Sequence, residues 1–197
     1  MKQTDLCEYS DNDLISAVRE GKIEAFDQIV RRYESKVLGV LYGMMRNSDD
    51  ARDVAQDVFV KAYKSVDKFR GDSKLYTWLY RITVNMAIDY MRKKQKKAKV
   101  EYNDEVKISD DNPAVPVDRI SPSKTVQNKE LRTKLQEAIE QLPEEQKSTF
   151  VLREMQDMSY QEIAGVMNCS VGTVMSRLFY ARKKVRDMIK PYLEGVS

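Results

Sequence analysis

Apolar side chains recur at three- and four-residue intervals along most of this chain, which is the spacing of amphipathic helices. No segment has the strict two-residue alternation of a half-buried strand. Residues that interrupt helices are scarce, since the 197 residues include only seven glycines and five prolines. Hydrophobic residues make up 42% of the chain, which is enough to cover the inner faces of such helices. The sequence therefore predicts an all-α protein.

The first hundred residues have the spacing of four helices. Ser10 and Asp13 form a capping-box pattern ahead of the first helix. Ser48 and Ser73 are the candidate N-caps of the third and fourth helices, which would end near residues 67 and 94. The expected core face of the fourth helix consists of Leu75, Leu79, Ile82 and Met86.

A change of composition divides the chain after residue 97. Residues 98–127 contain three of the five prolines, and their acidic residues outnumber the basic ones. With little periodic apolar content, this segment is predicted to be a flexible acidic linker. We therefore expect two small helical domains, namely a four-helix N-terminal domain of residues 8–97 and a C-terminal domain of residues 128–193.

The C-terminal domain has its own helix signals. Pro143 suits the first position of a helix, and Ser159 with Glu162 forms a second capping-box pattern. Ser170 is the candidate N-cap of a last helix, which Pro191 would stop. Two short helices joined by such a brief connection predict a helix-turn-helix.

The last helix is expected to have two unlike faces, the inner one made of Val174, Leu178, Ala181 and Val185. Phe179 falls on the outer face among basic residues, where a purely structural helix has little use for an aromatic ring. A DNA-reading helix does use such a ring, because an apolar side chain can contact a thymine methyl group while serine and arginine reach base edges. An ordinary solvated basic helix is the alternative. The DNA-facing candidates are Met175, Ser176, Arg177, Phe179, Tyr180 and Lys183.

A second aromatic and basic surface is expected on the fourth helix. Tyr76 and Tyr80 lie four residues apart and off the expected core face, and the helix ends in a run of lysine and arginine. Rings interleaved with cations form stacking platforms for single-stranded bases, and the turn before the helix can hold an extruded base. Two alternatives stay open: the basic run can be a solvated tail, and Trp78 can belong to the core. The candidates are Phe69, Ser73, Lys74, Tyr76, Trp78, Tyr80, Arg92 and Lys93.

The third helix presents a different surface. Opposite its expected core face lie Asp53, Gln56, Asp57 and Val60. An acidic patch repels DNA, so that a protein partner is the better match. Solubility alone would explain the carboxylates, but it would not explain an exposed valine among them.

Several motifs follow one another at a recognisable spacing. In the N-terminal half they are 53–63, 69–73 and 76–82 with Asn85, and in the C-terminal half 142–143, 152–154, 159–164 and 171–174. With these motifs, which cover nearly all of residues 10–190, the chain resembles the extracytoplasmic-function (ECF) sigma factors of the sigma-70 family. It is most similar to the envelope-stress sigma-E type.

This resemblance implies a role for each surface. The face of Asp53, Gln56, Asp57 and Val60 would dock on the clamp helices of core RNA polymerase, and the apolar face of residues 131–152 on its flap. The turn at 69–75 and Asn85 would capture and open the −10 element. The last helix would read the −35 element, together with Arg153 and Thr173. The resemblance also implies promoter-specific initiation, no catalytic reaction, no cofactor or metal, and an anti-sigma factor as a further partner.

One departure from the family affects promoter choice. Relatives usually carry arginine or lysine where this chain has Met175, and often arginine where it has Tyr180. A guanidinium that reads guanine is the commonest specific contact, so no relative's −35 sequence is transferred to this protein.

Three other functions were weighed against the sequence. A conventional helix-turn-helix regulator would bind a palindromic site tightly by itself, and an RNA-binding or adaptor protein would need no promoter. An enzyme is disfavoured, because the chain has no histidine and no phosphate-binding loop. Its two cysteines, Cys7 and Cys169, cannot form a disulfide framework or a four-cysteine zinc site. Without a secretory or membrane-spanning apolar run, the chain is expected in the cytoplasm.

Overall fold

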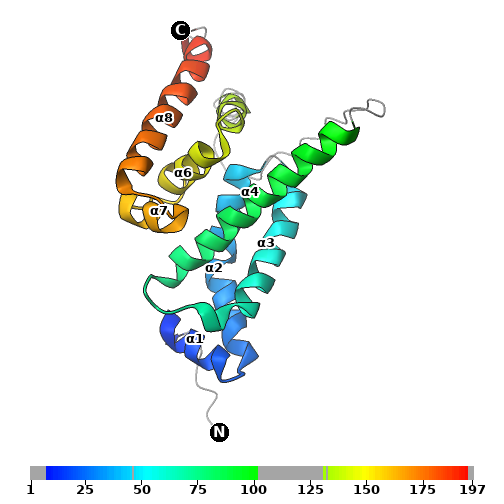
Figure 1. The fold of residues 1–197 in the computed structure, drawn as a ribbon, viewed down its shortest axis with the longest axis vertical. Helices are drawn as coiled ribbons and strands as arrows, with labels where there is room; N and C mark the ends of the chain where they lie inside the picture. Colours follow the sequence, from blue (N-terminus) through cyan, green and yellow to red (C-terminus); the bar gives the residue numbers. More distant parts are fainter. Residues whose placement is uncertain (1–7, 46, 102–130, 132, 195–197) are drawn as a thin grey trace, which may run out of the picture.

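The structure is a computed structural model that describes residues 8–45, 47–101, 131 and 133–194. Within these residues the regular elements are all helices (Figure 1). The predicted all-α class is therefore confirmed. Most of the predicted linker at 98–127 lies outside the described residues. None of the described helices combines the length and the apolar content that a membrane crossing requires.

The N-terminal module consists of α1 (Asp11–Arg19), α2 (Ile23–Met44), α3 (Ser48–Lys64) and α4 (Leu75–Glu101), with a short 3-10 helix at Val66–Lys68. The capping box ahead of α1 is confirmed, since the Asp13 amide donates to Ser10 Oγ at 3.3 Å and the Ser10 amide to Asp13 Oδ2 at 3.1 Å. The N-cap of α3 was predicted one residue late. Asn47 caps it by accepting from the amides of two following residues, at 2.8 and 3.0 Å, whereas Ser48 is already helical.

Helix α4 departs from its prediction in length and in core face. It continues to Glu101 rather than ending near residue 94, because the basic run is made of good helix formers without glycine or proline. Of its expected core face, Ile82 and Met86 are only partly buried, while Thr83 and Val84 are buried instead. The reason is that α4 packs against α2 and α3 on one side and against α7 on another.

The C-terminal module consists of a helix over residues 133–140 followed by α6 (Glu144–Glu154), α7 (Tyr160–Met167) and α8 (Val171–Glu194). Pro143 is the N-cap of α6 and not its first helical residue, because its ψ of 144° is extended. The capping box of Ser159 with Glu162 is confirmed. Helix α8 does not stop at Pro191 but continues past it to Glu194. A proline removes one hydrogen bond and crowds the preceding turn, and so close to a helix end this does not terminate α8.

The two modules are packed together. One hydrophobic cluster runs from Val37 and Leu41 in α2 and Leu79 in α4 to Leu152 in α6 and Ile163 in α7. A smaller cluster lies within the C-terminal module and consists of Ala138, Ile139, Leu142, Phe150, Ala181 and Val185. This smaller cluster contains part of the apolar face of residues 131–152, which the resemblance predicts to dock on the polymerase flap. In Figure 1, α7 lies against α4, while α8 stands on the outer side of the C-terminal module.

Candidate nucleic-acid and protein interfaces

Helix α8 is held in place by a tight turn from α7. Asn168 adopts the left-handed conformation (φ 49°, ψ 50°) that ends α7. Ser170 Oγ then accepts the Thr173 amide at 3.1 Å and caps the start of α8, as predicted. With Val174 and Leu178 buried against the other helices, the opposite face of α8 is fixed toward solvent. The predicted helix-turn-helix geometry is present.

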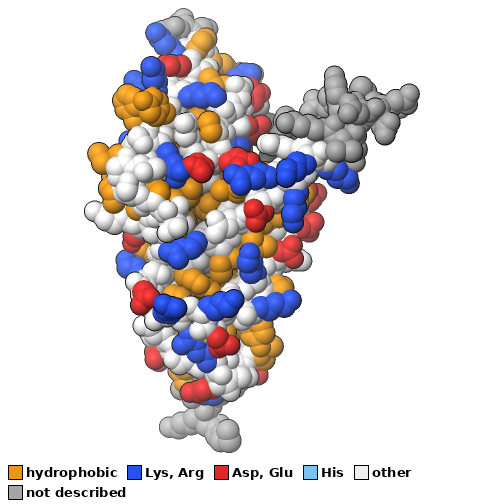
Figure 2. All heavy atoms as spheres, in the orientation of Figure 1, with side chains coloured by type: hydrophobic (Ala, Val, Ile, Leu, Met, Phe, Trp, Pro, Cys, Tyr) orange, Lys and Arg blue, Asp and Glu red, His pale blue; other side chains and the backbone are white. Residues whose placement is uncertain are grey.

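The outward face of α8 carries the large side chains predicted for it. Met175 is 55%, Phe179 63% and Tyr180 58% exposed. The rings of Phe179 and Tyr180 meet edge to face, with centroids 5.4 Å apart. Ser176 and Lys183 are exposed on the same helix. In Figure 2, hydrophobic side chains protrude among Lys and Arg side chains at the left edge, where α8 lies.

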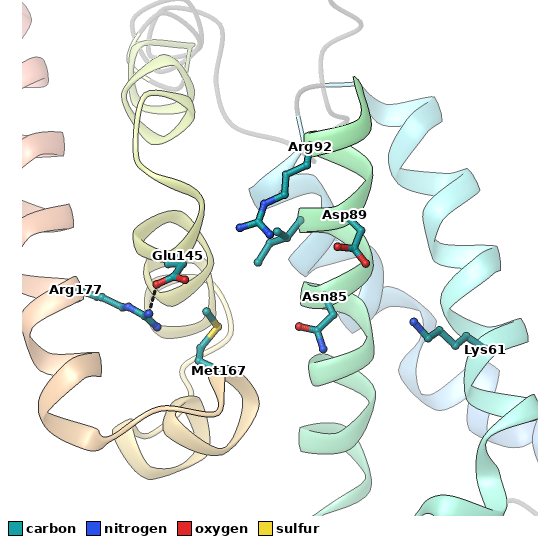
Figure 3. A pocket seen from close by; sticks show the side chains of 8 residues that line it. Lys61, Asn85, Asp89, Arg92, Glu145, Met167 and Arg177 are labelled. Carbon is teal, nitrogen blue, oxygen red and sulfur yellow. Dashed lines mark hydrogen bonds and ion pairs between the residues drawn. The ribbon is translucent and has the colours of Figure 1, made fainter. Parts of the chain in front are cut away.

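Three other residues predicted to contact DNA are partly buried and already have partners within the protein. Arg177 is turned toward the inside of the molecule, where it pairs with Glu145 of α6 (Figure 3). Arg153 is half-buried, donates to the Met158 carbonyl at 2.9 Å and lies over the Tyr160 ring. The half-buried Thr173 belongs to the cap of α8.

The aromatic and basic start of α4 is covered by the C-terminal module. The Tyr76 hydroxyl donates to the Glu162 carboxylate, and Lys74 Nζ lies 3.3 Å from the same group. Arg81 donates to the Gly165 carbonyl at 2.6 and 3.1 Å. Sequence reasoning missed these acceptors on α7, because nothing in the sequence indicates which helices of the two modules meet.

The predicted exposure of Tyr80 was wrong. It was expected to project from α4 as part of a stacking platform, but it is only 4% exposed, and its hydroxyl donates to Gln156 Oε1 at 3.0 Å. Burial raises the pKa of Tyr80 to about 12. The expectation failed because the C-terminal module covers the side of α4 that the N-terminal module leaves open.

The turn before α4 is well ordered by packing. Phe69 is buried, and its ring centroid lies 5.4 Å from that of Trp78, which packs half-buried against the core. Arg19, which sequence reasoning missed, donates to the carbonyls of Val66 and Phe69 and fastens this turn to α1. Ser73 is half-buried in the turn.

A polar pocket of about 390 Å³ lies between α4 and the C-terminal module (Figure 3). Asn85, Asp89 and Arg92 line it from α4, and Met167 and Arg177 from the other side. Arg92 also pairs with Glu144 at 2.8 Å. Lys93, one residue on, is exposed, and Figure 2 shows Lys and Arg side chains gathered along α4. Helix α7 thus covers part of the predicted DNA-reading surface of α4, while the outward face of α8 stays exposed.

The Glu162 carboxylate is the electrostatic centre of this contact. Hydrogen bonds from Tyr76 and then from the Ser159 amide lower its pKa from the ordinary 4.5 to about 2. The pKa of Tyr76 is raised, first by burial and then by its bond to Glu162. The ionised carboxylate therefore joins the two modules.

The predicted protein-binding face of α3 is fully available. Asp53, Gln56 and Asp57 are exposed, and Val60 is 50% exposed beside them. Tyr63, one turn after Val60, is also exposed and packs edge to face on Phe26, with centroids 5.1 Å apart. Among the described residues, no group of acidic, cysteine or histidine side chains is arranged to hold a metal ion.

Comparison with known proteins identifies the family. The profile of sigma-70 region 2 matches residues 29–97, and that of sigma-70 region 4 matches residues 132–185. The RNA polymerase sigma-H factor of Pseudomonas aeruginosa is 36% identical over 191 residues, which are 95% of this chain and 98% of that protein. The chain belongs to the sigma-70 family. The ECF RNA polymerase sigma-E factor of Escherichia coli (strain K12) is 37% identical over 93% of the chain and 96% of its own length, in agreement with the ECF type.

Two solved structures share this fold. CnrH in complex with the cytosolic domain of CnrY has a TM-score of 0.66 at 23% identity and covers 92% of this chain and 97% of its own. The sigma factor RpoE from Bartonella quintana, in complex with the anti-sigma factor NepR, has a TM-score of 0.67 at 22% identity, covering 84% and 96%. The likeness extends over both modules.

As a sigma-70 factor, the protein binds RNA polymerase and directs promoter recognition in transcription initiation. Sigma factors are not a family of enzymes. The two matched segments fall inside the predicted domains 8–97 and 128–193, whose boundaries remain predictions. The regulator and adaptor alternatives are set aside by the presence of both sigma regions in one chain.

Proposed function

We propose that this sigma factor uses three surfaces for three tasks. The α3 face of Asp53, Gln56, Asp57 and Val60 docks on the clamp helices of core polymerase. The start of α4, with Tyr76 and Asn85, holds the opened −10 strand, and α8 reads the −35 duplex. The chemistry of the exposed side chains supports this division, because the α3 face is acidic and repels DNA, while α8 is basic and aromatic.

The protein would be active only as part of the polymerase complex. Each reader is small and makes few base contacts, so neither binds tightly by itself. When polymerase holds the two modules at a fixed separation, their two contacts with DNA reinforce each other through effective concentration. Opening the duplex costs a few kcal/mol per unstacked step, which stacking on aromatic side chains and contacts with the basic run would offset.

The packed arrangement fits a resting form of the factor. Tyr76, Lys74 and Arg81, which would contact the −10 strand, are engaged by Glu162 and Gly165 of the C-terminal module. Binding that strand would require these contacts to break. We infer that docking on polymerase separates the modules and that an anti-sigma factor opposes this separation. We also infer that both events take place in the cytoplasm and that this chain catalyses no reaction.

Transcription in vitro with purified core polymerase tests the proposal. Addition of the protein should give run-off transcripts from a specific subset of genomic promoter fragments, and Asp53→Lys should reduce their yield. If core polymerase initiates at the same sites with and without the protein, the proposed function is wrong.

A further inference from the structure

The outward face of α8 has an exceptional concentration of exposed apolar side chains. Seven large hydrophobic side chains are exposed in the described residues, and three of them, Met175, Phe179 and Tyr180, lie within six residues of one helix. They remain exposed although the modules are closed on each other. A cluster of this kind marks a binding surface.

The charges around this cluster indicate a polyanionic partner. Lys183 and Arg186 follow Phe179 along α8 and are exposed. Lys184 is exposed too and donates to the Gln141 carbonyl at 2.6 Å. A helix that combines cations with exposed apolar groups matches a duplex, in which phosphates flank the major groove.

The arginines nearest the middle of α8 are paired with carboxylates of α6, which compete with DNA for their donors. Arg177 pairs with Glu145 on the inner side, and Arg182 donates two hydrogen bonds to Glu154 Oε1 at 2.6 and 3.0 Å. An arginine that reads guanine needs both its donors for the O6 and N7 atoms of the base. The side chains that remain at the centre of the face are chiefly apolar.

We propose that α8 recognises the −35 element mainly through the 5-methyl groups of thymines, contacted by Met175 and Phe179, with Tyr180 packed beside Phe179. This rests on the proposed role of α8 in reading duplex DNA and specifies what it reads. In the major groove the thymine methyl is the apolar group, whereas guanine, cytosine and adenine present donors and acceptors. Apolar side chains pressed against those polar edges would remove their water without replacing the hydrogen bonds.

The geometry of the helix sets the spacing of the contacted bases. Met175 and Phe179 are one turn apart, or about 6 Å along the axis at about 1.5 Å per residue. Base pairs along the duplex are about 3.4 Å apart. Because a helix in the major groove is inclined to the DNA axis, the two side chains contact thymines at most about two base pairs apart, with Lys183 on a phosphate beyond them.

The test uses the complete protein bound to core polymerase. Binding to a library with a randomised upstream duplex selects the −35 element, and each thymine of the selected element is then replaced by deoxyuridine, which lacks only the methyl group. Burial of one methyl group predicts an affinity loss of about fourfold per contacted thymine. Phe179→Ala should abolish the loss at one position, and Met175→Ala at another position no more than about two base pairs away.

Lys183→Ala is the matched control on the same face. It should weaken binding to all sequences and reduce the dependence of affinity on salt, while leaving the response to deoxyuridine unchanged.

Three outcomes are decisive. Equal affinity for thymine and deoxyuridine at every position would overturn the thymine proposal while the sigma function stands. Weaker binding of Phe179→Ala to core polymerase without DNA would mean that a protein occupies this face, and would also overturn it. If no upstream sequence is selected at all, both the thymine proposal and the proposed −35 function of α8 are wrong.

Discussion

Gly43 of α2 lies where α6 packs against the N-terminal module, and it offers a way to open the molecule without touching either DNA-reading surface. A Cβ atom at this position would lie 2.7 Å from Val151 Cγ1 and 2.7 Å from Met155 Sδ. Met155 is half-exposed and can swing away, but Val151 is fully buried and branched at Cβ. Gly43→Ala should therefore force α6 away from α2.

The size of the effect follows from two opposing contributions. Overpacking of a close contact costs about 1–3 kcal/mol, and this cost applies only while the modules are closed. Alanine favours the helix over glycine by about 1 kcal/mol, and this gain applies to α2 in either arrangement. The equilibrium between closed and open forms should shift toward the open form by a factor of roughly 5–150, with no loss of stability in the N-terminal module.

Gly165→Ala is the matched control, because it makes the same change in α7 at the contact with α4. There a Cβ atom would meet Thr77 Cγ2 at 3.8 Å, an ordinary van der Waals distance. Small-angle scattering of the purified variants should give a larger radius of gyration for Gly43→Ala than for the wild type or Gly165→Ala. The Gly43 variant should also bind single-stranded −10 DNA more tightly. Identical scattering and binding for all three proteins would refute the inferred resting form.

Three further predictions concern Tyr76, Asp53 and Glu162. Tyr76→Ala should leave duplex binding by the polymerase complex unchanged but reduce promoter opening, and equal permanganate reactivity at the −10 thymines would remove its stacking role. Asp53→Lys should weaken core-polymerase binding, because it reverses a charge in the acidic α3 face; a pull-down with unchanged affinity would exclude that surface. The hydrogen bonds from Tyr76 and Lys74 lower the pKa of Glu162, so its ionised form stabilises the closed arrangement at neutral pH, and this contribution is lost as the pH falls below 4.5; the bonds from Ser159 lie within α7 and persist in either arrangement. Scattering below pH 4 should therefore show opening in the wild type, and Glu162→Gln should show a smaller change over the same range.

The helices and three of their N-terminal caps could be predicted because they depend on local signals. Ser10, Ser159 and Ser170 cap helices through side chains within three residues of the amides that they accept. The outward face of α8 could be predicted for the same reason, since residues one helical turn apart share a face and those half a turn apart lie on opposite faces.

The contacts between the modules could not be predicted in this way. Tyr80 lies off the face of α4 that packs on its own module, so helical spacing placed it in solvent, yet it bonds to Gln156 across a separation of 76 residues. The same limit applies inside the C-terminal module, where Arg177 was assigned to DNA for its charge but pairs with Glu145 of another helix. Helical spacing shows which side chains share a face, but it does not show which distant helix covers that face.

Energy transfer between dyes on α4 and α8, the two proposed DNA-reading helices, is the most direct test of whether polymerase separates them. The dyes would be attached to cysteines introduced by Lys93→Cys in α4 and Lys183→Cys in α8, with Cys7 and Cys169 replaced by serine. High transfer in the free protein that falls on addition of core polymerase is the expected result. Unchanged transfer in a complex that initiates transcription would contradict it.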